Sequence, residues 1–287
     1  MRTLILGLGY VGTALAERFV ADGHDVVGIR RGVSDEGEAP PGVEVRHGDI
    51  ADSSFWAQLD EGFDWVIHCA SSSRGGIESY RDVFEKGSRL LARWLGNHPP
   101  KRFVFTSSTS VYAQTDGSVV DEGSPAEGAG ETGKILRGAE DEFLAACDQS
   151  KILRVAGIYG PGRGHLFLKY LADEARLTGD PGRWLNQVHR DDVVGAIQAL
   201  LPNNAAPPVT IVADDEPVTQ SDFFTWLSER LGKSMPPVAE APTKRKRALT
   251  NKRVANTQLR ELGYQLRFPT FREGYLDEMK RLALPIL

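Results

Sequence analysis

Three glycines near the amino terminus form the clearest chemical pattern in the chain. They are spaced Gly-x-Gly-x-x-Gly and are Gly7, Gly9 and Gly12. The pattern follows an apolar run at residues 3–6 and opens a helical stretch, where such glycines allow a tight turn, close approach of a pyrophosphate, and close packing of helix on strand. The amides of Tyr10 and Val11 would meet the phosphate at the positive end of that helix. The pattern predicts a dinucleotide site; the alternative is a glycine-rich turn without a ligand.

Two arginines stand where such a site reads the adenosine ribose. An NAD site carries Asp or Glu about 20 residues past the glycines, where it bonds the ribose hydroxyls. This chain has Arg30 and Arg31 there, at the end of the second apolar run. Guanidinium groups bind phosphate through charge-assisted hydrogen bonds. The pair therefore predicts NADP(H), unless both arginines are solvated loop charges.

Short segments after the next apolar runs complete the predicted cofactor site. Asp49 could bond the adenine amino group and Ile50 could pack on the ring, although Asp49 also suits a helix N-cap. Ala70 and Ser71 leave room for the cofactor after the fourth run. Cys69 is interpreted as a buried strand residue, because nothing near it in the sequence would lower its pKa.

Alternating strand and helix patterns must position these residues. Apolar runs of strand length occur at residues 3–6, 25–29, 43–46, 65–69, 102–106 and 152–155, and helical patterns lie between them at 11–21, 53–59, 77–96 and 133–146. This alternation predicts an α/β fold, a Rossmann doubly wound parallel sheet whose strands are buried on both faces.

The regular alternation breaks down beyond residue 160. Helical patterns follow at 166–176, 191–201, 220–231, 252–262 and 272–282, with one strand at 209–212. We expect an NADP-binding domain at residues 1–165, to which residues 189–215 return. Residues 166–287 are expected to form a smaller, mainly helical cap that binds the substrate.

Composition narrows the classes of function. The chain has 287 residues, a net charge of -5 and two cysteines, Cys69 and Cys147. The acidic balance argues against nucleic-acid binding, and two cysteines give neither a disulfide framework nor a metal-ligand spacing. No segment approaches the roughly 20 apolar residues that span a bilayer, and the run TLILGLG is short for a signal peptide. We expect a cytoplasmic protein, monomer or homodimer, without metal, membrane or nucleic-acid partner.

Further motifs give the chain a family resemblance. They are His47-Gly48-Asp49 and residues 105–112 (FTSSTSVY), 153–163 (LRVAGIYGPGR) and 188–194 (VHRDDVV). Together with the glycines they resemble the extended branch of the short-chain dehydrogenases/reductases, the NAD(P)-dependent sugar epimerases and dehydratases. The resemblance covers nearly the whole chain. It implies an NADP-dependent oxidoreductase or epimerase acting on a sugar-like small molecule, nucleotide sugars included.

The resemblance also implies a catalytic Asn–Ser/Thr–Tyr–Lys tetrad, of which half is missing. Ser108 matches the family Ser, and Lys134 matches the Lys that contacts the nicotinamide ribose. Gly130 stands four residues before Lys134, where the Tyr belongs, and Phe84 occupies the Asn position. The chain therefore resembles an atypical member of the family.

Several substitutes for the missing Tyr are open. Glu131 could act as acid or base, although an ion pair with Lys134 is the plainer interpretation. Tyr112 could reach in, although that family position mostly supports a loop. The basic residues 244–247 (KRKR) and 252–253 either hold a substrate diphosphate or form a solvated face.

Three functions follow from these patterns. The first is the NADP-dependent oxidoreductase or epimerase, with Ser108, Lys134 and Glu131 as catalytic candidates. The second is a non-catalytic NADP(H)-binding redox sensor or partner-binding protein. The third is a dehydratase- or isomerase-like activity with Glu131 as base.

Overall fold

The computed structural model describes residues 1–32, 39–59, 61–72, 75–178, 180–239 and 250–287. The chain divides into two compact units. The first comprises residues 1–111, 126–154 and 194–210, and the second comprises 112–125, 155–193 and 211–287. The basic residues 244–247 lie outside the described part of the chain.

A seven-stranded sheet forms the centre of the Rossmann fold, in the order β12-β7-β5-β4-β1-β2-β3. Its strands are β1 (Arg2–Leu6), β2 (Asp25–Arg30), β3 (Val43–His47), β4 (Trp65–His68), β5 (Arg102–Ser108), β7 (Ser150–Val155) and β12 (Val209–Val212). The order reverses between β1 and β4, and in such sheets ligands bind at the carboxyl ends of the strands beside the reversal. The predicted doubly wound α/β fold is confirmed.

The strand ladders align the carboxyl ends that carry the predicted site. Leu6 of β1 pairs with Ile29 of β2 and His68 of β4 in parallel register. Their apolar side chains are buried because helices cover both faces of the sheet. The residues that follow each strand therefore emerge at one edge.

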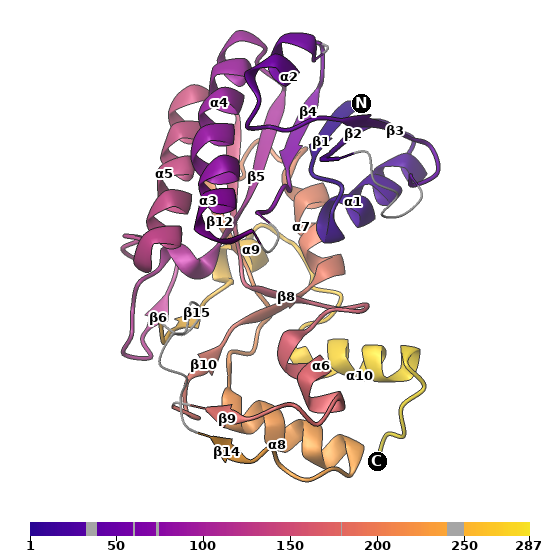
Figure 1. Cartoon of the computed structure of the whole chain (residues 1–287), viewed down its shortest axis with the longest axis vertical. Helices are drawn as coiled ribbons and strands as arrows, with labels where there is room; N and C mark the ends of the chain where they lie inside the picture. The colour runs from indigo at the N-terminus through magenta and orange to yellow at the C-terminus, as the bar shows by residue number, and fades with distance from the viewer. Residues whose placement is uncertain (33–38, 60, 73–74, 179, 240–249) are drawn as a thin grey trace. The chain divides into compact units, whose positions relative to one another are not determined.

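Helices of the first unit cover both faces of the sheet (Figure 1). They include α1 (Tyr10–Ala21), α2 (Ser53–Gln58), α3 (Gly76–Arg81), the π-helical turn η1 (Asp82–Gly87), α4 (Ser88–Asn97) and α5 (Gly130–Ala146). A further helix is α7 (Arg190–Leu200). The side-chain amide of its Gln198 donates a hydrogen bond of 2.6 Å to Asp22, the residue after α1. The helix predicted at residues 77–96 is found as one continuous helical stretch over residues 76–97, with a π-helical turn at Asp82–Gly87.

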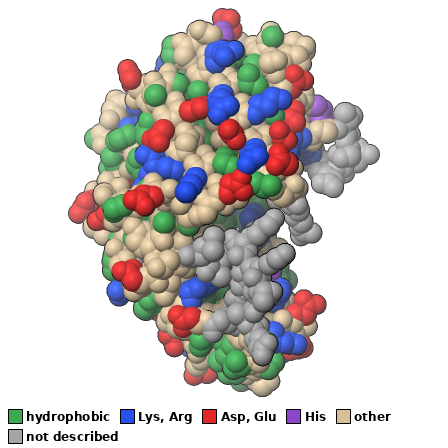
Figure 2. Space-filling view, turned by 60° about the vertical axis from the view of Figure 1, so that its left-hand side comes forward, with side chains coloured by type: hydrophobic (Ala, Val, Ile, Leu, Met, Phe, Trp, Pro, Cys, Tyr) green, Lys and Arg blue, Asp and Glu red, His purple; other side chains and the backbone are tan. Residues whose placement is uncertain are grey.

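Acidic and basic side chains are interspersed over the outer surface around α4 and α5 (Figure 2). Arg89 bonds Glu85 at 3.0 Å and Glu142 at 3.4 Å, and Arg137 bonds Asp141 at 2.6 Å. Such exposed pairs contribute little to stability individually. They keep this surface polar.

The second unit combines helices with short paired strands. Its strands are β6 (Val119–Val120), β8 (Gly157–Tyr159), β9 (Leu177–Thr178), β10 (Trp184–Leu185), β11 (Gln187–His189), β13 (Val218–Thr219), β14 (Val238–Ala239) and β15 (Arg253–Val254). Its helices are α6 (His165–Leu171), α8 (Gln220–Leu231), α9 (Thr257–Glu261) and α10 (Phe271–Arg281). Aromatic residues fill its core, where the rings of Tyr159 and Tyr275 stack at 4.3 Å.

The helix predicted at residues 252–262 is wrong over its first half. Arg253 and Val254 form β15, which pairs with β6, and only Thr257–Glu261 is helical. Lys252 is buried, and its Nζ donates to the carbonyl of Tyr112 and to Oγ1 of Thr250, both at 3.0 Å. These contacts hold the segment extended against the loop after Tyr112, and they leave Lys252 neither solvated nor free for a phosphate.

Candidate functional site

The glycine turn between β1 and α1 is closed at two of its three glycines. Gly7 has a φ of +99°, and a Cβ atom on it would lie 2.5 Å from the Cα of Ala70. A Cβ on Gly12 would lie 2.0 Å from the carbonyl oxygen of Gly7. Neither distance is tolerable for a side chain, so both glycines are required by the packing of the turn itself.

Gly9 differs from the other two because no atom of the described residues lies within 4 Å of where its Cβ would be. It is the N-cap of α1, and no side chain caps this helix end. The amides of Tyr10 and Val11 therefore point outward without intrahelical acceptors, as they do in the first turn of any helix. The first turn carries no acidic residue, so its electrostatic preference is for an anion.

The two arginines lie at the carboxyl end of β2, the strand next to β1 in the sheet. Arg30 ends β2, and its carbonyl accepts a hydrogen bond of 3.1 Å from the amide of Gly48. Arg31 is exposed, and its Nη2 donates to the carbonyl of Ser71 at 3.3 Å. This bond links the ends of β2 and β4 and brings Arg31 to Ser71, a proximity that residues 40 apart in the chain do not reveal.

Asp49 and Ile50 lie in the turn between β3 and α2, and only Asp49 is exposed. One carboxylate oxygen of Asp49 accepts the amide of Ala51 at 2.9 Å. The interpretation of Asp49 as a helix N-cap is wrong, since Asp52 caps α2 by accepting the amide of Ser54 at 2.9 Å. Ile50 is buried, and it lies against Gly87 of η1.

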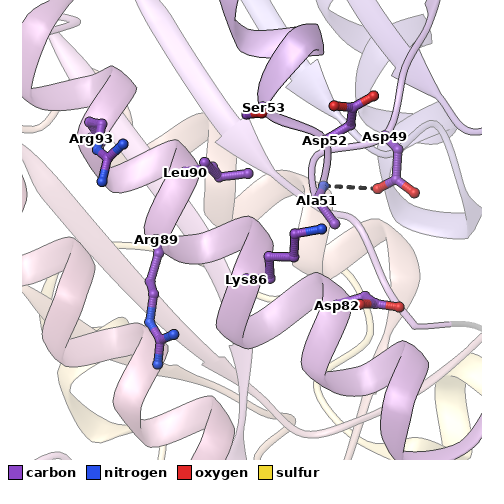
Figure 3. A pocket seen from close by; sticks show the side chains of 9 residues that line it. All are labelled: Asp49, Ala51, Asp52, Ser53, Asp82, Lys86, Arg89, Leu90 and Arg93. Atoms are coloured by element: carbon purple, nitrogen blue, oxygen red, sulfur yellow. Dashed lines mark hydrogen bonds between the residues drawn. The ribbon is translucent and has the colours of Figure 1, made fainter.

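A cavity of about 620 Å³ opens beside Asp49 (Figure 3). The β3–α2 turn and the segment from η1 to α4 line it, through Asp49, Ala51, Asp52, Ser53, Asp82, Lys86, Arg89, Leu90 and Arg93. Hydrogen bonds from Ser54 hold the pKa of Asp52 below its ordinary value, and the nearby Lys86 acts in the same direction. The cavity is therefore a polar region with charges of both signs.

The end of β4 supplies small residues and no nucleophile. Burial raises the pKa of the Cys69 thiol to about 12, so it stays protonated at neutral pH. Ala70 is half-buried and approaches Gly7, and the carbonyl of Ser71 receives Arg31. Cys69 follows the last residue of β4 and is half-buried, so it is not the buried strand residue that was predicted, although its raised pKa agrees with the prediction that it is no nucleophile.

Ser108 ends β5 and begins the 3-10 turn η2 (Thr109–Val111). Its Oγ accepts the amide of Ser110 at 3.2 Å, so it caps this turn. The hydroxyl hydrogen is not used in that bond and can be donated elsewhere. Ser108 is half-buried at the carboxyl end of β5.

The start of α5 has no phenol and no acid–base pair. Gly130 has a φ of +64°, a backbone conformation that a tyrosine rarely adopts. Glu131 forms an ion pair with Arg81 of α3, so the predicted Glu131–Lys134 ion pair is wrong. Lys134 is exposed and forms no hydrogen bond or ion pair with the described residues.

A buried charged cluster fixes α5 to the sheet. Glu140 accepts the Ser107 hydroxyl at 2.5 Å and Nη2 of Arg154 at 2.8 Å. All three side chains are buried. In the sequence, only three polar residues inside apolar stretches mark this cluster.

Phe84 stands in η1, where the resemblance places an Asn. It is 7% exposed and its ring stacks on that of His68 at 6.1 Å. His68 is fully buried, and neither ring nitrogen has a hydrogen-bond partner among the described residues. Aromatic packing thus replaces a polar group at this position. Tyr112 is also fully buried, as expected of a loop support.

Comparisons with known proteins agree with this geometry. The model of the NAD dependent epimerase/dehydratase family matches residues 3–212. Protein YeeZ of Escherichia coli (strain K12) is 29% identical over 280 residues, which cover 93% of this chain and 96% of YeeZ.

Two solved structures have the same fold. DesIV of Streptomyces venezuelae, a dTDP-glucose 4,6-dehydratase with NAD bound, superposes with a TM-score of 0.82 at 21% identity, covering 98% of this chain and 96% of DesIV. Human epimerase family protein SDR39U1, with NADPH bound, superposes with a TM-score of 0.75 at 21% identity, covering 96% of this chain and 98% of SDR39U1.

Among the described residues, no helix combines the length and the apolar character that crossing a membrane requires.

Proposed function

The chain belongs to the NAD dependent epimerase/dehydratase family, and from this membership we propose that it is an NADP(H)-dependent oxidoreductase or epimerase. Members of this family carry out their chemistry with a bound nicotinamide cofactor, while the protein supplies binding and orientation.

The open space above Gly9 carries the cofactor proposal. Gly7 and Gly12 are glycines because the backbone leaves no room for a side chain, but no protein atom explains Gly9. A pyrophosphate filling that space would bind the amides of Tyr10 and Val11. The residues present therefore fit a dinucleotide.

Arg30 and Arg31 support a 2′-phosphate on that dinucleotide. Arg30 is the last residue of β2, and Arg31, the next residue, is exposed and reaches Ser71. A guanidinium offers several donors in a plane, which suits a phosphate better than a ribose hydroxyl. Human SDR39U1 binds NADPH and DesIV binds NAD, so the choice for this chain rests on its own arginines.

The adenine end would lie along the β3–α2 turn. Asp49 is exposed there, and among the described residues only the Ala51 amide donates a hydrogen bond to its carboxylate. The remaining lone pairs can accept the adenine amino group. Ile50 is buried against Gly87 and would support the floor of the site from beneath.

We propose a sugar-like substrate, with nucleotide sugars as the first class to test. DesIV, whose fold this chain shares, is named for dTDP-glucose. Ser108 would donate its hydroxyl hydrogen to an oxygen of the substrate, since the Ser110 amide engages only a lone pair of its Oγ. A bound nicotinamide would exchange hydride with the adjacent substrate carbon. The chain's own part is to bind both molecules, align them and hold the substrate oxygen at Ser108.

A non-catalytic NADP(H) sensor is the second candidate function. The observation that favours it is Gly130, which lacks a phenol and whose positive φ disfavours one. Glu131, the nearest carboxylate, is committed to Arg81. A binding protein needs the glycine turn and the arginines but no acid or base.

Purified protein should first be titrated with NADPH and NADH, and then incubated with NADPH or NADP⁺ and a panel of nucleotide sugars and small carbonyl compounds. Nicotinamide absorbance detects net redox turnover, and nuclear magnetic resonance of the sugar detects epimerisation. Turnover of a panel member supports the enzyme. NADPH binding without turnover of any member supports the sensor, and failure to bind either nucleotide would overturn both.

A further inference from the structure

Helix α5 turns one definite side toward the sheet, and that side is marked by burial. Its buried residues are Gly133, Leu136, Ala139, Glu140 and Phe143. Glu140 bonds Ser107, the residue next to Ser108 in β5. The side of α5 that carries Glu140 therefore faces the strand that carries Ser108.

Helical spacing places Thr132 on this side and Lys134 on another. Residues four apart lie above one another on a helix, so Thr132, Leu136 and Glu140 form one row. Lys134 is two residues from both Thr132 and Leu136, a rotation of roughly 200° at 3.6 residues per turn. Its exposure and its lack of a partner among the described residues agree with an outward direction.

The first turn of α5 also abuts the turn that follows Ser108. A Cβ on Gly133 would lie 2.9 Å from the carbonyl oxygen of Ser110, and the amide of Gly128 donates to the carbonyl of Val111 at 2.7 Å. Thr132 is exposed, and its hydroxyl has no hydrogen bond to the part of the chain described. An open hydroxyl thus lies at the sheet-facing start of α5, beside the turn that Ser108 caps.

We propose that Thr132, together with Ser108, faces the reacting end of the bound dinucleotide, and that Lys134 does not. This inference rests on the proposed NADP(H) site. The pair of residues four apart on the sheet-facing side is Thr132 and Leu136, not Gly130 and Lys134. Leu136 is buried and apolar, so this side of the helix offers hydroxyl groups that orient a ligand and no cation that contacts a ribose.

Cysteine labelling tests the proposal without requiring catalysis. Thr132→Cys and Lys134→Cys differ by two positions on one exposed helix turn, so each is the control for the other. Thiol-labelling rates are measured for both, with and without NADPH, and peptide mass spectrometry separates the new thiol from Cys69 and Cys147. With NADPH at about ten times its Kd, labelling at 132 should slow about tenfold and labelling at 134 should change less than about twofold.

The outcomes separate the two levels of inference. If NADPH binds the unmodified protein but protects position 134 rather than 132, or neither, the assignment of Thr132 is overturned while the cofactor proposal stands. If the unmodified protein does not bind NADPH in a fluorescence titration, the cofactor proposal itself fails.

Steric substitution provides a second measurement. Thr132→Trp should weaken NADPH binding by more than about tenfold, because the indole would occupy the space of the reacting end. Lys134→Trp should leave Kd within about twofold. Circular dichroism and urea unfolding confirm that both variants fold, and equal effects of the two substitutions on Kd would contradict the proposal.

Discussion

At the scale of single residues, the site depends on positions where a side chain is absent or a charge is present. Gly7, Gly9 and Gly12 look equivalent in the sequence, yet protein backbone excludes a side chain at Gly7 and Gly12, while the Cβ position of Gly9 is open and is filled by the ligand in our proposal. Arg30 and Arg31 supply the positive charge at the end of β2. Each group yields a prediction that binding alone can check.

Replacing Gly9 with Val should abolish NADPH binding and spare the fold. The new side chain meets no protein atom, so its effect falls on the ligand that approaches the backbone there. Fluorescence titration measures the affinity and circular dichroism the fold. Gly138→Val is the matched control, because Gly138 in α5 also has no atom of the described residues within 4 Å of its Cβ position. This variant should bind NADPH normally. Normal affinity in Gly9→Val would remove the basis of the cofactor proposal.

Arg31→Ala should cost about tenfold in NADPH affinity, roughly 1.4 kcal/mol, and leave NADH affinity unchanged. The reason is that the guanidinium would bond only the 2′-phosphate, which NADH lacks. Isothermal titration with both nucleotides gives the comparison. Arg18→Ala, which removes an exposed arginine in the last turn of α1, should change neither affinity. An equal loss for both nucleotides would mean that Arg31 supports the turn through Ser71 instead.

At the scale of elements, the direction that α5 faces is set by one buried ion pair. Glu140 joins the helix to β5 through Ser107 and to β7 through Arg154. Exposed pairs such as Arg137–Asp141 lie on the same helix but bind it to nothing else. The two kinds of pair should differ sharply in their effect on stability.

Glu140→Gln should destabilise the protein by about 3–5 kcal/mol, because it leaves the Arg154 charge buried without its partner. Asp141→Asn should cost no more than about 1 kcal/mol. Urea unfolding midpoints measure both. The double change Glu140→Leu with Arg154→Met should recover most of the loss, since it removes both charges. A small effect of Glu140→Gln would show that water reaches the cluster.

At the scale of the whole molecule, a buried imidazole makes stability depend on pH. His68 lies among Phe84, Phe105 and Phe143, and burial lowers its pKa from 6.5 to about 4. Between these values the unfolded chain binds a proton that the folded chain does not. Stability is therefore unaffected above about pH 6.5 and falls as the pH drops from there toward 4.

His68→Phe should remove this contribution and keep the ring packing. The unmodified protein should lose about 2 kcal/mol of unfolding free energy between pH 7 and pH 5 from His68 alone. Urea unfolding at both pH values measures the loss, which should be smaller by that amount in the variant. His189 has a pKa lowered to about 4, chiefly by burial, so part of the acid sensitivity should persist in His68→Phe.

The sequence by itself determined the strands of the central sheet and most of the helices. Strand runs, helix periodicity and the glycine spacing depend on residues a few positions apart, and those relations survive folding unchanged. The β1–α1 turn and the two arginines at the end of β2 therefore lie where the sequence predicts. Helix α8 has its predicted bounds, Gln220–Leu231.

Only the tertiary structure decided which residues meet across the fold. Glu131 is paired with Arg81, 50 positions away, and not with Lys134, three positions away. The rotation of α5 about its axis is set by Glu140 with Ser107 and Arg154, contacts between separate elements. Local periodicity states which residues share a face of a helix, but the direction of that face depends on packing between segments distant in sequence, and the candidate site depends on that direction.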